Sequence, residues 1–239
     1  MKRFAIAALA FAWMAQAEQR RPVLLELFTS EGCSSCPPAD ALLEELDKTQ
    51  PIAGTEILVL SEHVDYWDHD GWRDRFSSPL FTARQRSYGD SFHLDEVYTP
   101  QIVVDGAAEV LGSDKGAALR AVTQASRAEK LAVSLTLLPD ARAALKIGVL
   151  PASVTHDATV FVAVADAEDS TDIRGGENKG RRLHHVAVVR SLTAIGKITA
   201  KDGFTKELPL GDHPEHMRLI AFVQESKQGR ILGSAMLAR

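Results

Sequence analysis

The sequence predicts an α/β domain followed by an all-β domain, and three observations carry that prediction. Residues 23–28 (VLLELF) and 56–60 (EILVL) are short apolar runs bounded by turn residues, a pattern typical of buried strands. The segment between them has a single apolar stripe at helical spacing. After about residue 128 the helical stripes stop, and short alternating segments replace them.

The first of these elements predict a strand–helix–strand unit. The helix is indicated by apolar residues at positions i, i+3, i+4 and i+7, namely Ala39, Leu42, Leu43 and Leu46. Pro37 and Pro38 precede the stripe, where a first helical turn tolerates missing N–H groups. Short connections on both sides favour a right-handed crossover between two parallel strands.

The rest of this domain is predicted from weaker patterns. Residues 62–97 are an irregular insertion, rich in aromatic and polar residues, with a helix from about residue 79 to 88. Residues 101–104 form a strand, Asp105-Gly106 a hairpin turn, and residues 108–111 the returning strand. Ser113 is the expected cap of a last helix.

The second half of the chain predicts an antiparallel, sandwich-like β domain. Residues 131–137 and 145–149 alternate between apolar and polar side chains. Further strands are expected at residues 159–165, 186–190, 204–208, 218–224 and 231–236. The predicted domains are therefore residues 18–128 and residues 129–239.

The first 17 residues are typical of a secretory signal peptide. Lys2 and Arg3 precede an apolar run, and Ala15-Gln16-Ala17 is a small-x-small cleavage site. The run is shorter than the roughly 20 residues of a membrane-spanning helix. We therefore expect a periplasmic or secreted protein without a stable membrane span after cleavage. The net charge of −5 argues against nucleic acid as a partner.

The two cysteines, Cys33 and Cys36, indicate chemistry more than stability. A pair this close closes a very small loop, so its disulfide contributes little loop-closure entropy. At the start of a helix, the first thiol is favoured as thiolate, with a pKa lowered from about 8.5 toward roughly 3.5–7.5. Cys33 is thus the expected attacking thiol and Cys36 the resolving one. Glu26 is a candidate proton relay, with a surface-facing or a neutral structural glutamate as the alternative.

A Cys-x-x-Cys between a buried strand and an amphipathic helix, in an exported chain, resembles the thioredoxin superfamily. In that superfamily a cis-proline precedes the strand opposite the active site, which implies a site role for Thr99 and Pro100. The sequence more closely resembles a bacterial family of secreted thioredoxin-like proteins that is catalogued as a domain of unknown function. The matching segments are residues 28–40 (FTSEGCSSCPPAD), 63–67 (HVDYW), 81–85 (FTARQ), 176–181 (GENKGR) and 188–190 (VVR). The resemblance implies a thioredoxin-like fold with an insertion, and it supplies no substrate.

Two further segments are candidate walls of a substrate groove. His63, Tyr66 and Trp67 belong to a histidine-, aspartate- and aromatic-rich segment that follows a predicted strand. A surface loop with aromatic packing, or a metal-binding loop, are the alternatives. Asn178 and Arg181 lie in a glycine-rich basic segment, residues 174–182, which is either a plain hairpin connection or a loop that covers the cysteines.

No metal site or cofactor is predicted. His184-His185 and the histidines at 213 and 216 do not match a four-ligand zinc pattern, and we interpret them as turn or strand-end residues.

Three functions remain open from the sequence. The first is an exported thiol–disulfide oxidoreductase that acts on a protein or a small-molecule disulfide or thiol. The second is a binding module of thioredoxin fold with a static disulfide. The third is the handling of copper or zinc through the two thiolates. The direction of electron transfer, the reduction potential, the redox partner and the oligomeric state do not follow from the sequence.

Overall fold

The predicted strand–helix–strand unit is present at the start of the fold. The computed structural model describes residues 20–237, except residues 70, 155, 200–201 and 211–215, so the expected signal peptide lies outside the described residues. β1 (Arg21–Thr29) and β2 (Thr55–His63) are parallel and in register from end to end. α1 (Pro37–Thr49) connects them, with Cys36 at its N-cap.

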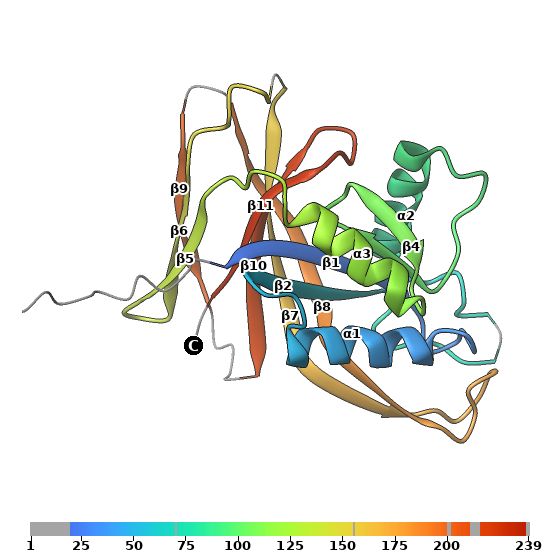
Figure 1. Cartoon of the computed structure of the whole chain (residues 1–239). Helices are drawn as coiled ribbons and strands as arrows, with labels where there is room; N and C mark the ends of the chain where they lie inside the picture. The colour runs from blue at the N-terminus through green and yellow to red at the C-terminus, as the bar shows by residue number, and fades with distance from the viewer. Residues whose placement is uncertain (1–19, 70, 155, 200–201, 211–215, 238–239) are drawn as a thin grey trace, which may run out of the picture.

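The other helices lie in the first half of the chain (Figure 1). α2 (Pro79–Phe92) occupies the predicted insertion, and α3 (Lys115–Ala125) follows a hairpin of β3 (Gln101–Val104) and β4 (Ala108–Leu111). The cap of α3 is Asp114, whose carboxylate accepts a hydrogen bond from the N–H of Ala117, rather than the predicted Ser113.

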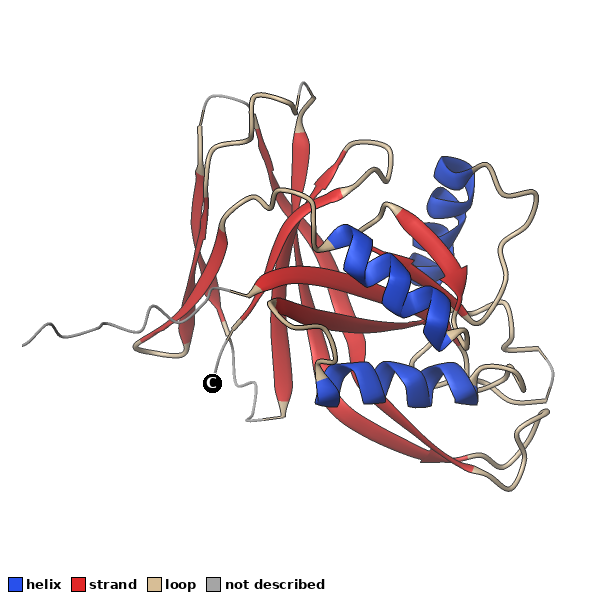
Figure 2. Ribbon diagram, viewed as in Figure 1, coloured by secondary structure: helices blue, strands red, loops and turns tan. Residues whose placement is uncertain are grey.

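Strands dominate the second half of the chain (Figure 2). They are β5 (Val133–Leu138), β6 (Arg142–Ile147), β7 (Ala158–Asp172), β8 (Arg182–Ile198), β9 (Phe204–Pro209), β10 (Met217–Glu225) and β11 (Ile231–Met236). One sheet has eight strands in the order β11-β10-β7-β8-β2-β1-β3-β4, and a second has three in the order β5-β6-β9.

The expected thioredoxin-like α/β domain followed by a separate β-sandwich is wrong as a fold class. The described chain is mostly β, with 44% strand and 18% helix, and its eight-stranded sheet is mixed. The sheet crosses the expected boundary because β8 pairs in parallel with β2, at Ser61 and Val188. Alternating apolar residues predict that a segment is a strand, but they do not say which strand it pairs with. The boundary between residues 128 and 129 itself stays a prediction.

The two faces of β1 contact different helices, because successive side chains of a strand point to opposite faces. Thr29 donates a hydrogen bond to Asp40 of α1, whereas Glu26 pairs with Arg84 of α2. The β1–β2 region is therefore covered by α1 on one face and by α2 on the other. A second apolar core lies between the three-stranded sheet and strands β7, β10 and β11 of the large sheet.

The long β7–β8 hairpin brings the second half of the chain to the first. It packs against α1, and the loop at its tip, residues 173–181, is here called the hairpin-tip loop. No helix within the described part of the chain is both long and apolar enough to cross a membrane.

Candidate functional site around the Cys33–Cys36 disulfide

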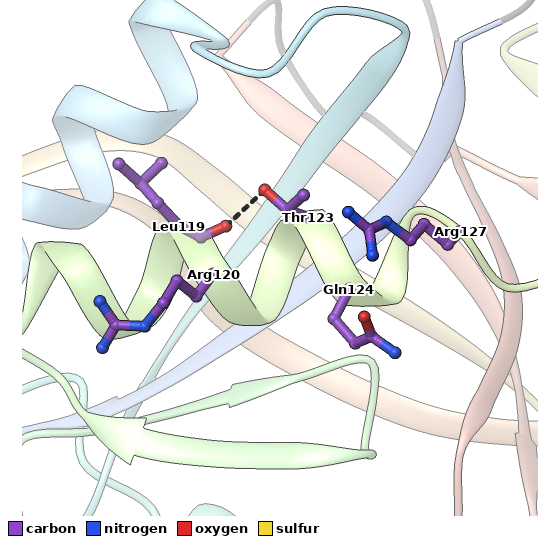
Figure 3. Close-up of a pocket in the computed structure, with 5 residues that line it drawn as sticks. All are labelled: Leu119, Arg120, Thr123, Gln124 and Arg127. Atoms are coloured by element: carbon purple, nitrogen blue, oxygen red, sulfur yellow. Dashed lines mark hydrogen bonds between the residues drawn. The ribbon is translucent and has the colours of Figure 1, made fainter.

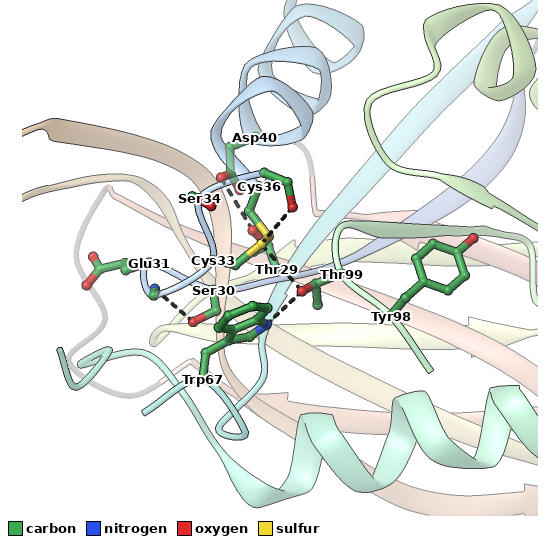
Figure 4. The surroundings of a disulfide bond; sticks show 12 residues. Thr29, Ser30, Glu31, Cys33, Ser34, Cys36, Asp40, Trp67, Tyr98 and Thr99 are labelled. Atoms are coloured by element: carbon green, nitrogen blue, oxygen red, sulfur yellow. Dashed lines mark hydrogen bonds between the residues drawn. A yellow bond between two sulfur atoms is a disulfide. The ribbon is translucent and has the colours of Figure 1, made fainter. Parts of the chain in front are cut away.

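Cys33 and Cys36 form a disulfide in the turn between β1 and α1 (Figure 4). The turn is short because Cys36 caps α1: its carbonyl accepts hydrogen bonds from the N–H groups of Ala39 and Asp40. Pro37 takes the first helical position, where an N–H group would have no partner within the helix. Both cysteines are fully buried, while Ser34 and Ser35 between them are exposed.

The two sulfurs differ in their hydrogen bonding. The Thr99 hydroxyl donates to Cys33 Sγ over 3.4 Å, and the Ser35 hydroxyl lies 3.4 Å from the same sulfur. Among the described residues, none hydrogen-bonds to Cys36 Sγ. Hydrogen-bond donors favour a charged sulfur over a neutral one, so this arrangement favours thiolate at Cys33.

Trp67 covers the site from the loop that follows β2. Its indole N–H donates to the Thr99 hydroxyl over 2.8 Å, and Thr99 in turn contacts Cys33 (Figure 4). The loop approaches so closely that a Cβ at Gly32 would lie 3.0 Å from the Trp67 carbonyl oxygen. A residue with a side chain at position 32 would therefore displace Trp67.

Pro100 lies beneath the same region. The Thr99–Pro100 peptide bond is cis, and Pro100 is buried. Its carbonyl accepts a hydrogen bond from the N–H of Gly112, which places it at the junction of β3 and β4. Thr99 thus contacts Cys33, and the site role of Pro100 that the resemblance implied stays a prediction.

The hairpin-tip loop also reaches the cysteine turn. The Asn178 side-chain amide donates to the carbonyl oxygens of Glu31 and Cys33, each over 2.9 Å. Glu177 accepts a hydrogen bond from the N–H of Ser34, and the Ser34 side chain together with this N–H lowers the pKa of the Glu177 carboxyl. Arg181 donates a hydrogen bond to the Asn178 side-chain oxygen over 3.0 Å and so helps to orient the Asn178 amide. These contacts agree with the hypothesis that residues 174–182 cover the cysteines.

A buried ionisable cluster lies behind the turn, and we call it the His185 cluster; its members are His185, Asp40, Glu31, His63 and Asp74. His185 Nδ1 lies 3.5 Å from the Asp40 carboxylate, and its Nε2 lies 3.7 Å from that of Glu31. Burial alone would lower the pKa of His185, but the two carboxylates outweigh it and raise that pKa to about 10. His185 is therefore an imidazolium at neutral pH.

His63 and Asp74 complete the cluster. His63 Nδ1 lies 2.7 Å from Asp74, and the His63 ring meets the His185 ring at 4.7 Å between centroids. Asp74 also accepts the N–H of Glu31 over 2.8 Å, which ties the loop after β2 to the cysteine turn. Burial raises the pKa of Asp74, but His63 and the backbone N–H groups of Glu31 and Phe76 prevail and bring it to about 2.

Glu26 lies in a different buried group, the Arg84 cluster, which consists of Arg84, Glu26, Glu62, Tyr88 and Gln224. Arg84 is 2.5 Å from Glu26 and 3.7 Å from Glu62. Burial and the neighbouring charge of Glu26 raise the pKa of Glu62 well above its usual range. No hydrogen bond of this cluster leads to the cysteines, so the role of Glu26 as a proton relay stays a prediction without support from its contacts.

Of the three predicted groove residues after β2, the structure brings two to Thr99. Trp67 donates to the Thr99 hydroxyl, and the Tyr66 side chain hydrogen-bonds to Thr99 and donates to the side-chain oxygen of Gln85 over 3.1 Å. The rings of Tyr66 and Trp67 lie 6.4 Å apart. His63 is instead fully buried in the His185 cluster.

Sequence analysis missed four residues of the site, namely Asp40, Asp74, Trp72 and His185. Trp72 donates its indole N–H to the buried Glu31 carboxylate over 2.9 Å. His185 was interpreted as a turn or strand-end residue, but it lies inside β8 with 1% of its surface exposed. One signal was available: Asp40 follows Cys36 by four residues, which places the two side chains on the same side of α1.

A second surface feature lies along α3. A depression of about 300 Å³ is lined by Leu119, Arg120, Thr123, Gln124 and Arg127 (Figure 3). All five come from α3 and the turn after it, and the Thr123 hydroxyl bonds back to the Leu119 carbonyl of the same helix. This is an exposed helix face without converging groups from other elements. Across the residues that the structure describes, no group of three or more His, Cys, Asp or Glu side chains is placed to hold a metal ion.

Comparisons with known proteins find one solved structure and one protein family. A structure search finds an X-ray crystal structure of a protein from Agrobacterium tumefaciens, determined by a structural genomics consortium. It is 26% identical, with a TM-score of 0.74, and the match covers 92% of this chain and 96% of that one. A search of curated proteins found no match. None of these comparisons supports membership of the thioredoxin superfamily.

The comparison with protein families matches residues 24–224 to one described as "Protein of unknown function (DUF1223)". The matched region begins inside β1 and ends in β10, so it includes the disulfide, the Thr99–Pro100 segment and the hairpin-tip loop. Because the match spans most of its 239 residues, the chain belongs to the family of proteins of unknown function DUF1223.

Proposed function

We propose that this protein is an exported thiol–disulfide oxidoreductase that uses Cys33 and Cys36 on a protein or small-molecule disulfide. Two hydroxyl groups lie 3.4 Å from Cys33 Sγ, whereas none of the described residues hydrogen-bonds to Cys36 Sγ. This difference between the two sulfurs is the observation that carries the proposal. Export is supported by the signal-peptide pattern of residues 1–17 and by the disulfide itself, which persists in oxidising compartments.

The surroundings of the disulfide support a role in redox chemistry rather than a role in stabilising the fold. The bond links residues three positions apart, so it removes little freedom from the unfolded chain. Yet five ionisable side chains, the His185 cluster, are buried next to it. Burying charges costs free energy that a merely structural turn does not require. A redox site needs such groups because thiol–disulfide exchange moves protons as well as electrons.

The proposed reaction has two exchange steps. The Cys33 thiolate attacks a substrate disulfide, forms a mixed disulfide and releases one substrate thiolate. Cys36 then loses its proton and attacks Cys33 Sγ, which forms the Cys33–Cys36 bond and releases the second substrate thiolate. The substrate is reduced to two thiols and the cysteine pair is oxidised to the disulfide. The same steps in reverse oxidise a dithiol substrate.

The structure corresponds to a closed form of the site, because both sulfurs are fully buried. Trp67 and the hairpin-tip loop are the two covers that contact the cysteine turn. Trp67 is half-buried and held to Thr99 by one hydrogen bond, whereas Asn178 is buried and makes two bonds to the turn. Displacement of Trp67 is therefore the less costly way to admit a substrate sulfur to Cys33.

The test is turnover of oxidised glutathione with a thiol as the electron donor. We expect Cys33→Ser to abolish turnover and Cys36→Ser to accumulate a mixed disulfide on Cys33, detected by mass spectrometry. Ser34→Ala is the matched control, because Ser34 lies between the cysteines with its side chain exposed. Unchanged turnover in Cys33→Ser would refute the assignment of the nucleophile.

The complete burial of both sulfurs favours a second candidate, a binding module with a static disulfide. In that case the exposed Ser34–Ser35 turn and the hairpin-tip loop would form a docking surface. The two candidates differ in one measurement, the reduction of the disulfide by excess dithiothreitol in the folded protein. Resistance to dithiothreitol supports the static disulfide, and reduction with retention of the fold supports the oxidoreductase.

A further inference from the structure

The proton that Cys36 must exchange has no obvious route to solvent, since Cys36 and its neighbours Asp40 and Thr29 are buried. Asp40 follows Cys36 by four residues on the same side of α1, so their side chains are neighbours. Thr29 donates to one oxygen of the Asp40 carboxylate over 3.3 Å, and Figure 4 shows both residues beside the disulfide. The other Asp40 oxygen faces His185 and has no hydrogen-bond partner among the described residues.

We propose that Asp40 and His185 are a buried proton reserve for Cys36, which gives its proton to this pair when the disulfide closes and recovers it when the disulfide opens. This inference rests on the proposed function and names the residues that handle its proton. Asp40 is the group next to the cysteine, and His185 is a positioning residue that acts through Asp40.

The proton transfer balances with the exchange reaction. In the closed form His185 is an imidazolium beside the Asp40 carboxylate. When a substrate thiolate attacks Cys33 Sγ, the sulfur–sulfur bond breaks and its electron pair leaves on Cys36. The proton of His185 Nδ1 moves to Asp40 and from Asp40 to that sulfur, which leaves Cys36 as a thiol and His185 neutral. A second substrate thiolate then attacks the mixed disulfide, and Cys33 departs as the thiolate.

The groups around His185 explain why it holds a proton inside the protein. Asp40 faces it from α1, Glu31 from the turn after β1, His63 from β2, and Asp74 stands behind His63 from the following loop. The His185 cluster contains three carboxylates and two imidazoles. The excess of acidic groups favours the protonated form of at least one imidazole. The carboxylates raise the pKa of His185 to about 10 in spite of burial, so the reserve is loaded at neutral pH.

Several buried polar atoms of the His185 cluster lack a hydrogen-bond partner among the described residues. They are both ring nitrogens of His185, Nε2 of His63, and one carboxylate oxygen each of Asp40 and Glu31. Distances of 3.5 and 3.7 Å from His185 to its carboxylates are longer than a hydrogen bond in a settled ion pair. A small rotation of the imidazole would bring it to either carboxylate. The cluster therefore has the freedom that a proton carrier needs, and a purely structural ion pair would be expected to close these gaps.

The first test follows His185 by NMR in the folded protein and needs no change within the cluster. Cys33→Ser leaves Cys36 as the single thiol, and Cys36→Ser leaves Cys33. As pH rises, the ring signals of His185 should show an additional titration step in Cys33→Ser, at the pKa of the Cys36 thiol, and no such step in Cys36→Ser. The same behaviour of His185 in both variants would overturn the proposal.

The second test measures the rate at which dithiothreitol reduces the wild-type disulfide across a range of pH. His185→Asn and Asp40→Asn should each slow reduction about 100-fold at neutral pH, the lower end for proton-transfer catalysis, and change the pH profile. His184→Asn is the matched control, since His184 is the adjacent residue of β8 and its partners, Glu44 of α1 and Ser170 of β7, lie outside the His185 cluster. We expect the control to keep the wild-type rate.

The outcomes separate the two proposals. Wild-type rates and pH profiles in both His185→Asn and Asp40→Asn would refute the proton reserve and leave the oxidoreductase intact. If the wild-type disulfide resists dithiothreitol altogether, the oxidoreductase fails, and the NMR titration of the two cysteine variants still decides whether His185 senses Cys36. If His185→Asn fails to fold, Asp40→Asn and the titration remain.

Discussion

The side-chain amide of Asn178 donates a hydrogen bond of 2.9 Å to the carbonyl of Cys33, although 145 positions separate the two residues. The same nitrogen donates to the carbonyl of Glu31, so one buried side chain satisfies two carbonyls of the cysteine turn. The turn itself contributes only two backbone hydrogen bonds, from the N–H groups of Cys33 and Cys36, each of 3.2 Å. The second half of the chain therefore fixes the shape of the turn that carries the disulfide.

Replacement of Asn178 by alanine should destabilise the protein by about 2–4 kcal/mol, because the Glu31 carbonyl loses the Asn178 amide and the Cys33 carbonyl keeps only the N–H of Cys36. The disulfide of this variant should also be reduced faster by dithiothreitol, since the turn is held less firmly. Urea denaturation measures the first effect and a quenched time course the second. Lys179→Ala is the control, because Lys179 is the exposed neighbour and should change stability by less than about 0.5 kcal/mol. Equal stability of the two variants would contradict the structural role of Asn178.

Thr99→Val should raise the pKa of the Cys33 thiol in the reduced protein. The substitution keeps the branched shape but removes the hydroxyl that donates to Cys33 Sγ. A hydrogen bond to a charged group contributes ~1.5–3 kcal/mol, and each pKa unit corresponds to about 1.4 kcal/mol, so the rise should be about 1–2 units. The pH dependence of iodoacetamide alkylation, followed by mass spectrometry, measures it. Thr99→Ser retains the hydroxyl and should keep the wild-type pKa, and a shift of equal size in both variants would count against the hydrogen bond.

Local patterns predicted the region around the cysteines well. The strands at residues 23–28 and 56–60 are confirmed, and so is a helix after Cys36, since periodicity and turn residues report short-range structure. The order of strands could not be predicted, because the pairing of β8 with β2 depends on contacts between residues more than 100 positions apart. This is why the predicted fold class did not include a mixed eight-stranded sheet with strands from both halves of the chain.

The same limit applies to the site. Cys33, Cys36, Thr99 and Trp67 were identified from motifs and from a family resemblance, and they are brought together. His185 was interpreted as a turn or strand-end residue, because it matches no four-ligand zinc pattern and lies just before the strand predicted at residues 186–190. Its significance comes from the approach of β8 to α1, which places it between Asp40 and Glu31. A sequence pattern can identify a site histidine of this kind only when the position of its strand relative to the helix is already known.

The stability of the oxidised protein should depend on pH through His185. Its pKa is raised from 6.5 to about 10 in the folded state, so the folded protein binds this proton more tightly than the unfolded chain. The resulting stabilisation is fully present below about pH 6.5 and is lost as pH rises toward 10. The free energy of unfolding should therefore fall by a few kcal/mol across this range, because each pKa unit corresponds to about 1.4 kcal/mol.

Guanidinium denaturation at a series of pH values measures this fall. His185→Asn should lose most of it, since asparagine does not titrate, whereas His184→Asn should retain it. His184 has 37% of its side chain exposed, so its ion pair with Glu44 is screened by solvent. Parallel pH profiles for wild type and His185→Asn would show that the carboxylates do not hold a proton on this ring.

Arg84 should be among the most sensitive positions for folding, although it lies on the face of β1 opposite the disulfide. Its guanidinium is the only cation of the Arg84 cluster, in which it contacts Glu26 and Glu62 and donates to Tyr88 and Gln224. Arg84→Met keeps the length of the side chain but leaves the two carboxylates facing each other without the charge that separates them. Removal of one partner of a buried ion pair costs about 3–5 kcal/mol.

Urea denaturation of Arg84→Met against Arg86→Met tests this expectation. Arg86 lies two residues further along α2 with its side chain exposed, so the control should change stability by less than about 0.5 kcal/mol. The loss in Arg84→Met should shrink at acidic pH, since burial and the charge of Glu26 raise the pKa of Glu62 and its protonation removes the repulsion that the substitution creates. A loss that is independent of pH would instead indicate that Arg84 stabilises the fold through packing against Tyr88, Phe161 and Phe222, whose rings lie within 5.5 Å of its guanidinium.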